Sequence, residues 1–308
     1  MKIKLTGTPI KILTTAILMI LVIRSLSLER IASLMGSIDT IILLPVLLAA
    51  IAFVLLKWCK WHLLLIGRTE ALTPSLSMAS YLIGTAAGLV TPGRVGELGR
   101  AALFKEDDRT RVAGLVIFDR MIDLVTVAVY ALAGLFAVSR FLGTVTLVGI
   151  IILAAVIFGG DGVMKILNRI PLFKGLLKRF RGLEIMLQGW SGFDRRRLMI
   201  VTGISFLAFG VSLIQFHLLS EALFPGASLL AALISFPVLV LASAAPFTVS
   251  GFGAREAVAV LMMGRYAIPR EVAVSATLLS FTFNVAVPGL VGAAFLQHIG
   301  RDKTDTSV

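Results

Sequence analysis

The stretch TPGRVGELGR, Thr91–Arg100, follows an apolar run directly and combines a Pro-Gly break with three ionisable side chains. Arg94, Glu97 and Arg100 stand at positions i, i+3 and i+6, so in a helical segment they lie broadly on one side. Free N–H groups at a helix start and arginine guanidinium groups both suit an anion such as phosphate. The spacing therefore predicts an anion site, and the alternative is a solvated loop whose charges pair with one another.

A second group of charges, Asp119, Arg120 and Asp123, lies inside the apolar segment Val112–Val138. Measured from the start of that segment, Asp119 is about 10 Å and Asp123 about 16 Å along a helix, which is close to mid-bilayer, and all three fall within an arc of about 100°. Ionisable groups at this depth are costly unless they are paired or face a cavity. Arg120 and Asp123 could form a self-contained pair. A surplus carboxylate is otherwise available to a proton or to another arginine: Arg94, Arg100 or Arg255.

The stretch SGFGARE, Ser250–Glu256, repeats this logic later in the chain. A glycine-rich turn brings backbone amides close to a ligand, and Arg255 and Glu256 follow it directly. A plain packing turn is the alternative, and no G-K-[ST] follows that would indicate a nucleotide loop. The residues expected to shape the two turns are Pro92, Gly93, Gly96, Ser250, Gly251 and Gly253.

The composition indicates that these charged residues belong to a membrane protein. The chain has 308 residues, 58% of them hydrophobic and 15% charged, with a mean hydropathy of +0.98, whereas soluble domains are just under half apolar. The net charge of +12 indicates membrane orientation and contact with anionic lipid headgroups. We expect no nucleic-acid binding and no metal or other cofactor, because one cysteine and three scattered histidines offer no ligand spacing.

Eight apolar segments approach the length of about 20 residues that a membrane span requires: Pro9–Ile23, Thr40–Leu56, Ser75–Val90, Val112–Val138, Thr144–Phe158, Leu198–Leu219, Leu229–Pro246 and Val272–Leu296. Eight full crossings would place the basic N-terminus and the basic linker on opposite faces, against the positive-inside rule. Two re-entrant helical hairpins, at Ser75–Phe104 and Leu229–Gly264, remove the conflict. The predicted fold is all-α and polytopic, with about six full spans plus these hairpins in two inverted-repeat-like halves.

We expect one integral membrane domain: a first half (1–160), a basic amphipathic cytoplasmic linker (161–197) and a second half (198–308). Both termini are predicted to face the cytoplasm, in a multi-pass protein of the cell membrane. Gly84 and Gly88 form a GxxxG pattern that predicts close helix packing. Trp58 and Trp61, with Lys57 and Lys60, are interpreted as an anchor at the membrane interface.

Three motifs together resemble a known family: PGRVGELGR, FDRMID inside a helix, and PFTVSGFGARE, in this order along nearly the whole chain. They are similar to the flippase-like integral-membrane region of lysylphosphatidylglycerol synthases and their stand-alone relatives. Ser250 stands where that family often has glycine, so the shape of the second turn is not carried over. The synthases' transferase domain has no counterpart in these motifs, so their aminoacylating activity is not carried over either. The matched positions are Pro92, Gly93, Arg94, Gly96, Glu97, Arg100, Asp119, Arg120, Gly251, Gly253, Arg255 and Glu256.

The resemblance implies a lipid transporter rather than an enzyme. We expect Arg94, Arg100 and Arg255 to hold the phosphate of a phospholipid or polyprenyl-linked carrier near the bilayer midplane. The acids are expected to keep this site near charge balance: Glu97, Glu256, Asp119 and Asp123. Three alternatives stay open, namely a membrane-embedded lipid-modifying enzyme, an accessory or scaffold subunit of a lipid or glycan pathway, and a transporter of a water-soluble solute. Self-association and a partner synthase or glycosyltransferase also stay open.

Overall fold

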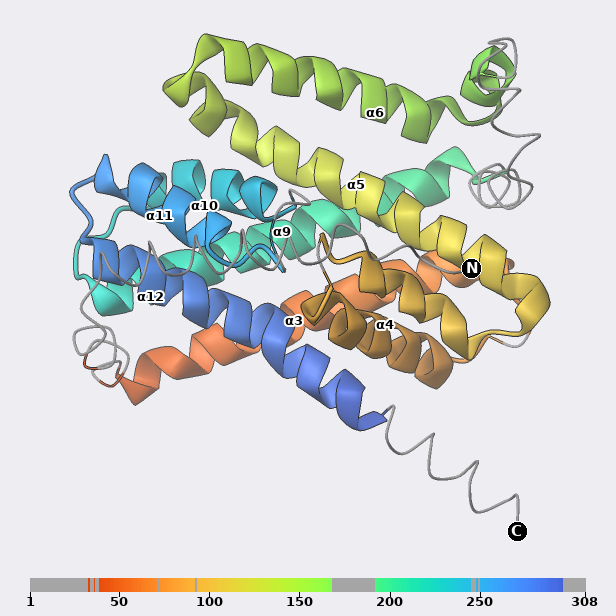
Figure 1. The fold of residues 1–308 in the computed structure, drawn as a ribbon, viewed down its shortest axis with the longest axis horizontal. Helices are drawn as coiled ribbons and strands as arrows, with labels where there is room; N and C mark the ends of the chain where they lie inside the picture. Colours follow the sequence, from red (N-terminus) through yellow and green to blue (C-terminus); the bar gives the residue numbers. More distant parts are fainter. Residues whose placement is uncertain are drawn as a thin grey trace.

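The computed structural model describes residues 39–70, 72–91, 93–167, 192–244 and 250–295, together with 33, 36 and 248, and their regular elements are all helices (Figure 1). Side chains are described up to residue 159 in the segment that ends at 167. The expected first helix at Pro9–Ile23, positions 168–191 of the basic linker, the C-terminal tail and Pro92 lie outside the described residues. The predictions for them stay predictions.

Five of the described helices are long and apolar enough to cross a membrane. They are α3 (Thr40–Leu65), α5 (Glu106–Val138), α6 (Arg140–Leu167), α9 (Arg195–Leu223) and a last helix formed by α12 (Arg270–Phe281), η2 (Thr282–Ala286) and the turns up to Phe295. Large apolar side chains on α3 and α6 are exposed, as in Leu44 and Ile151, which a surface facing lipid explains. The prediction of an all-α polytopic membrane protein is confirmed.

Two hairpins of shorter helices lie where the sequence predicts them. The first pairs α4 (Pro74–Leu89) with the 3₁₀ helix η1 (Val95–Leu103), and the second pairs α10 (Leu229–Ser243) with α11 (Ala254–Gly264). The 16 residues of α4 extend about 24 Å, which is less than the hydrocarbon thickness of about 30 Å. The loops of the two hairpins meet, because the backbone N–H of Gly93 donates to the carbonyl oxygen of Thr248 at 3.4 Å.

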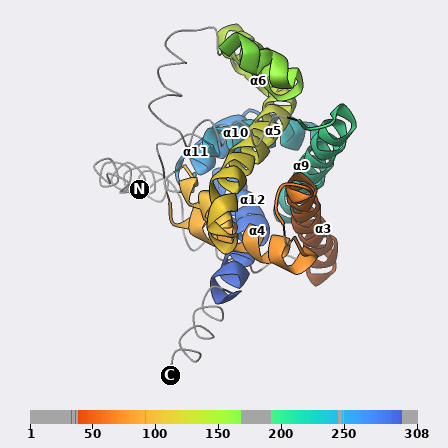
Figure 2. The same cartoon turned by 90° about the vertical axis from the view of Figure 1, so that its right-hand side faces the viewer.

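The long helices gather around these hairpins. Helix α3 packs along α9, and α5 packs against α10 and η1. Helix α6 packs along α5 and lies at the edge of the bundle (Figures 1 and 2). The first hairpin and the last helix also touch, because α4 contacts η2. The charged segments η1 and α5 are thus held together with the end of α3.

The starts of the hairpin helices follow from local sequence. Thr73 accepts a hydrogen bond from the backbone N–H of Leu76 at 3.1 Å, and Pro74 occupies the first turn, where its missing N–H costs nothing. Ser228 caps α10 in the same way through the N–H of Ala231 at 3.1 Å. These caps fix where each short helix begins and therefore where its tip falls.

Small residues on α4 allow η1 to approach closely. A Cβ atom on Gly84 would lie 2.2 Å from Cγ of Arg100, and one on Gly88 would lie 2.8 Å from Cγ of Glu97. The GxxxG pattern therefore marks close helix packing, as expected, and its specific role is to admit the stems of two charged side chains. Glu97 and Arg100 of η1 can be buried here because α4 leaves room for the aliphatic parts of their side chains.

Replacing Gly292 with alanine is expected to destabilise the protein by about 1–3 kcal/mol, because a Cβ there would lie 2.1 Å from the backbone carbonyl oxygen of Leu82. The matched control is Gly149→Ala in α6, where nothing lies within 4 Å of the added atom. Alanine at that position should stabilise the helix by up to about 1 kcal/mol. Thermal unfolding in detergent checks both variants, and equal melting temperatures would contradict the packing described here.

Candidate functional site

The first hairpin tip places three charges on one face. Gly93 and Arg94 adopt left-handed backbone conformations with φ of 59° and 55°, and η1 then turns with three residues per turn. In such a helix, residues three apart lie directly above one another. Glu97 forms ion pairs in both directions, with Arg94 at 2.9 Å and with Arg100 at 2.9 Å. The same-face prediction is confirmed, in a helix tighter than the α-helix.

Arg100 is buried at the centre of the site, with 1% of the residue exposed. One terminal nitrogen lies 2.9 Å from Glu97 Oε2 and the other 2.9 Å from Asp119 Oδ2. The guanidinium carbon of Arg100 is 4.9 Å from the ring centre of Trp61 and 5.1 Å from that of Tyr81. Trp61 is fully buried, so its interpretation as an interface anchor is wrong: it packs on a buried cation.

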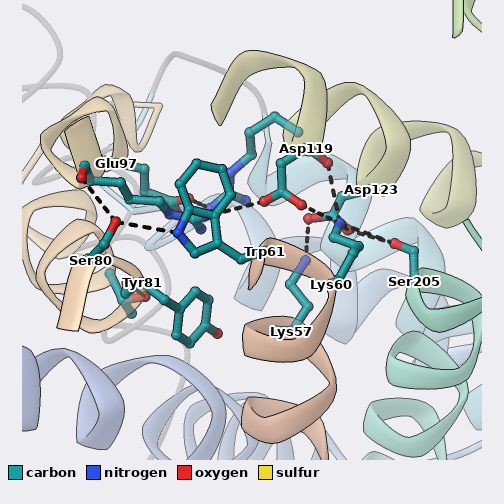
Figure 3. A network of polar contacts seen from close by, with 12 residues as sticks. Lys57, Lys60, Trp61, Ser80, Tyr81, Glu97, Asp119, Asp123 and Ser205 are labelled. Carbon is teal, nitrogen blue, oxygen red and sulfur yellow. Dashed lines mark hydrogen bonds and ion pairs between the residues drawn. The ribbon is translucent and has the colours of Figure 1, made fainter. Parts of the chain in front are cut away.

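Two lysines of α3 complete the network, and the sequence analysis missed them. Lys60 is fully buried, and its Nζ lies 2.6 Å from Asp119 Oδ1 and 2.5 Å from Asp123 Oδ1 (Figure 3). Lys57 forms an ion pair with Asp123, and the hydroxyl of Ser205 on α9 donates to Asp123 at 2.6 Å. The interface-anchor interpretation is wrong for these lysines as well. The signal that could have found them was the surplus carboxylate, which required a cation from elsewhere in the chain.

Arg120 does not form the self-contained pair with Asp123 that the sequence allowed. It forms an ion pair with Glu97, while Asp123 is paired with the lysines of α3. Within the described part of the chain, the connected network holds three carboxylates (Glu97, Asp119 and Asp123) and five cations (Lys57, Lys60, Arg94, Arg100 and Arg120). With all groups ionised, the network carries two more positive than negative charges, so the expectation of near charge balance is wrong.

Three cavities adjoin this network, and Arg94 lines all of them. The first, which we call the phosphate cavity, has a volume of about 130 Å³ and is bounded by four of the cations: Lys57, Arg94, Arg100 and Arg120. The second, the hydroxyl cavity, also has a volume of about 130 Å³ and lies between Arg94 and Arg255. The third, the side cavity, has a volume of about 490 Å³ and is lined mainly by apolar residues of η1, α5 and α10.

The second tip contributes Arg255, which is 5% exposed. Its Nε lies 2.5 Å from Glu256 Oε1, and its guanidinium carbon lies 3.8 Å from the ring centre of Phe281. Glu256 also accepts a hydrogen bond from the backbone N–H of Gly253 at 2.7 Å, which caps α11. Arg255 therefore faces the same cavity as Arg94, while Glu256 holds the turn.

The backbone angles of the second tip show what conformation Ser250 adopts there. Its φ is 51°, in the left-handed region, and Gly251 and Gly253 follow with φ of 80° and 82°.

Ser250→Gly is therefore expected to leave stability unchanged within about 1 kcal/mol, because glycine adopts this conformation without strain. Gly251→Ala should be clearly less stable, because its Cβ would lie 2.6 Å from that of Ser243. Thermal unfolding of the two variants separates them, and the reverse order would contradict the turn geometry.

Among the described residues, no group of three His, Cys, Asp or Glu side chains is placed so that it could bind a metal ion. The carboxylates of Glu97, Asp119 and Asp123 are paired with cations instead. The site is therefore basic, buried and adjacent to cavities. A site of this charge suits an anion better than a cation.

The chain matches a model of a known protein family over most of its length. Residues 9–292 match the model described as the lysylphosphatidylglycerol synthase TM region. A comparison with curated proteins gave no match. The family match covers both hairpins and every charged residue of the site. The chain therefore belongs to the family of the lysylphosphatidylglycerol synthase transmembrane region.

Proposed function

We propose that this protein moves a phosphate-bearing lipid between the leaflets of the membrane, through a site at the meeting point of its two hairpin tips. The observation that carries the proposal is the excess of cations in the network that bounds the phosphate cavity. An uncompensated positive charge away from water is costly, and a phosphate group that enters the phosphate cavity supplies the missing negative charge. Arginine and lysine are both established phosphate ligands.

The cations divide into two groups by exposure. The side chains of Arg94, Arg120 and Lys57 are 27%, 36% and 13% exposed, so they are accessible from the cavities and are assigned to the phosphate. Arg100 and Lys60 are enclosed by carboxylates. We assign them the role of holding those carboxylates, and through them the exposed cations, in position.

The two hairpins are proposed to be re-entrant. Glu70 precedes the first hairpin and Lys105 follows it, and their side chains form an exposed ion pair at 3.2 Å. The chain therefore enters and leaves this hairpin at the same end of the bundle. A broken segment of this kind provides a helix end and polar backbone at membrane depth, where it lines a cavity and not lipid.

The side cavity suits the hydrocarbon part of the substrate. It adjoins Arg94 and Arg120, and most of its remaining wall is apolar, including Leu98, Val116 and Leu124. An acyl or isoprenoid chain in contact with this wall would leave the phosphate beside the cations. This arrangement favours a lipid over a water-soluble solute.

The experiment is leaflet redistribution of lipids in liposomes that contain the purified protein, with protein-free liposomes as the control. The proposal predicts accelerated movement of a phosphate-bearing lipid and no acceleration for a neutral diacylglycerol. Mass spectrometry of the recovered lipids addresses the enzyme alternative, which requires a changed product. Unchanged redistribution for every phosphate-bearing lipid would contradict the proposal.

Membrane topology provides an independent test of the hairpin. In a Cys59→Ser background, single cysteines at positions 70 and 105 are labelled from either side of sealed vesicles. Re-entry predicts that both react with an impermeant reagent from the same side, which the proposed orientation makes the cytoplasmic one. Labelling from opposite sides would show that the segment between them crosses the membrane.

A further inference from the structure

The hydroxyl cavity has walls unlike those of the phosphate cavity beside it. Six short polar side chains from α9, α10, the second tip and the last helix line it: Ser212, Ser243, Ser250, Thr277, Ser280 and Asn284. Its charged residues are Arg94 and Arg255, and none of its lining residues is an acid. The two cavities share a wall that contains Arg94 and Asn284, so a ligand held by its phosphate on one side can extend into the other.

Several of these polar groups are buried without a partner within the described part of the chain. They are the hydroxyl of Ser250, one terminal nitrogen of Arg255 and the amide oxygen of Asn284. These residues are 3%, 5% and 5% exposed. Buried polar atoms are nearly always hydrogen-bonded, so three such atoms around one cavity indicate a ligand that supplies both donors and acceptors.

The position of Asn284 is fixed by the fold. Its amide nitrogen donates to Ser212 at 2.9 Å and to Gln215 at 2.6 Å, which leaves the oxygen as an acceptor. It lies in the π-helical turn η2, four residues before Pro288, whose ring cannot donate to the Asn284 carbonyl as an α-helix requires. Such turns often place residues at binding sites.

The rest of the wall is apolar and includes the rings of Phe53, Phe209 and Phe236. A few directed polar groups among aromatic faces form a site for a compact molecule with polar edges and apolar C–H faces. Polyols and sugars have this character. A cationic headgroup would meet two arginines and no acid, and an acyl chain would leave the hydroxyl and amide groups unpaired.

We propose that the hydroxyl cavity binds a hydroxyl-bearing headgroup, a polyol or a sugar, attached to the phosphate held by Arg94. This inference rests on the proposed function, because it needs the phosphate site. It assigns the substrate to phosphate-linked polyol or sugar lipids and excludes aminoacylated and other cationic headgroups.

The test measures the affinity of the full-length protein in detergent, by calorimetry, for four soluble probes: inorganic phosphate, glycerol 3-phosphate, myo-inositol 1-phosphate and phosphoethanolamine. We expect inositol phosphate to bind about tenfold more tightly than inorganic phosphate, which corresponds to one or two added hydrogen bonds. Phosphoethanolamine should gain nothing. Equal affinity for all four probes, or tightest binding of phosphoethanolamine, would overturn the inference while leaving phosphate binding in place.

Two variants test whether the preference for inositol phosphate arises in the hydroxyl cavity. Ser280→Leu fills the hydroxyl cavity and should abolish the preference for inositol phosphate while inorganic phosphate still binds. Ser250→Ala, a smaller change, should reduce the preference about fivefold, and the exposed Thr144→Ala on α6 is the control. A preference that survives both substitutions, in protein with an unchanged melting temperature, places the polyol elsewhere and overturns the inference. Failure of every probe, inorganic phosphate included, counts against the proposed function itself.

Discussion

Replacing Arg100 with glutamine is expected to lower the free energy of unfolding by about 3–5 kcal/mol, which is the usual loss when one partner of a buried ion pair is removed. Arg100 is 1% exposed and separates two carboxylates, Glu97 and Asp119, each 2.9 Å from one of its terminal nitrogens. Glutamine leaves those two buried carboxylates with one cation fewer. Chemical unfolding in detergent micelles measures the loss.

The control is Lys105→Gln, which also removes one cation from a carboxylate. Lys105 and Glu70 have side chains 70% and 81% exposed, and exposed pairs of this kind contribute about 0–1 kcal/mol. The double variant Arg100→Gln with Asp119→Asn should regain part of the stability, because it also neutralises a carboxylate that has lost one of its two cations. An effect of Arg100→Gln as small as that of Lys105→Gln would refute the central role assigned to Arg100.

The second large effect is expected in binding. Arg94→Gln should weaken binding of a phosphate-bearing lipid by about tenfold to a hundredfold, which is the contribution of one hydrogen bond to a charged group. Arg94 lines all three cavities, and its side chain is 27% exposed, so it is accessible to a ligand. Binding of fluorescent phosphatidic acid to protein in detergent, followed by thermophoresis, measures the loss.

The melting temperature of Arg94→Gln should fall much less than that of Arg100→Gln. Glu97 keeps two other cations, Arg100 and Arg120, when Arg94 is neutralised. Arg140→Gln, at the exposed start of α6, removes the same charge at a distance from the cavities. Equal losses of affinity in Arg94→Gln and Arg140→Gln would indicate general attraction of an anion to a basic protein and no defined site.

The helical plan could be predicted from the sequence because span length and breaks in apolar segments are local properties. The Pro-Gly break at Thr91–Gly93 and the glycines after Ser250 located both hairpin tips, and the spacing of Arg94, Glu97 and Arg100 gave their common face. These features depend on neighbours within about ten residues. A periodic pattern records such neighbours directly.

The lysines that pair with Asp119 and Asp123 could not be located from local sequence patterns. Lys60 pairs with Asp123 across 63 positions of sequence, and no local period connects α3 to α5. At the end of an apolar segment, Lys57 and Lys60 beside tryptophans have the same pattern as an interface anchor. The structure shows that this end of α3 is enclosed, because Lys60 and Trp61 are fully buried and Trp61 packs on Arg100. The error in the predicted charge balance followed from omitting these two lysines.

The shape of the second tip also depended on more than the sequence pattern. Serine rarely adopts the left-handed conformation, so Ser250 left the turn undefined until its φ of 51° was known. Glu256 was expected at the substrate, and its hydrogen bond to Gly253 gives it a capping role in α11. Whether the halves are inverted repeats stays a prediction.

The central claim is that lipid phosphate crosses the membrane at the cations between the two tips. Its most direct test is the rate of leaflet redistribution of one phosphate-bearing lipid in liposomes containing equal amounts of folded wild type or Arg94→Gln protein. We predict rapid redistribution with wild type and a rate at least about tenfold lower with Arg94→Gln, in line with the loss of one charged hydrogen bond. Equal rates for the two proteins would contradict the claim.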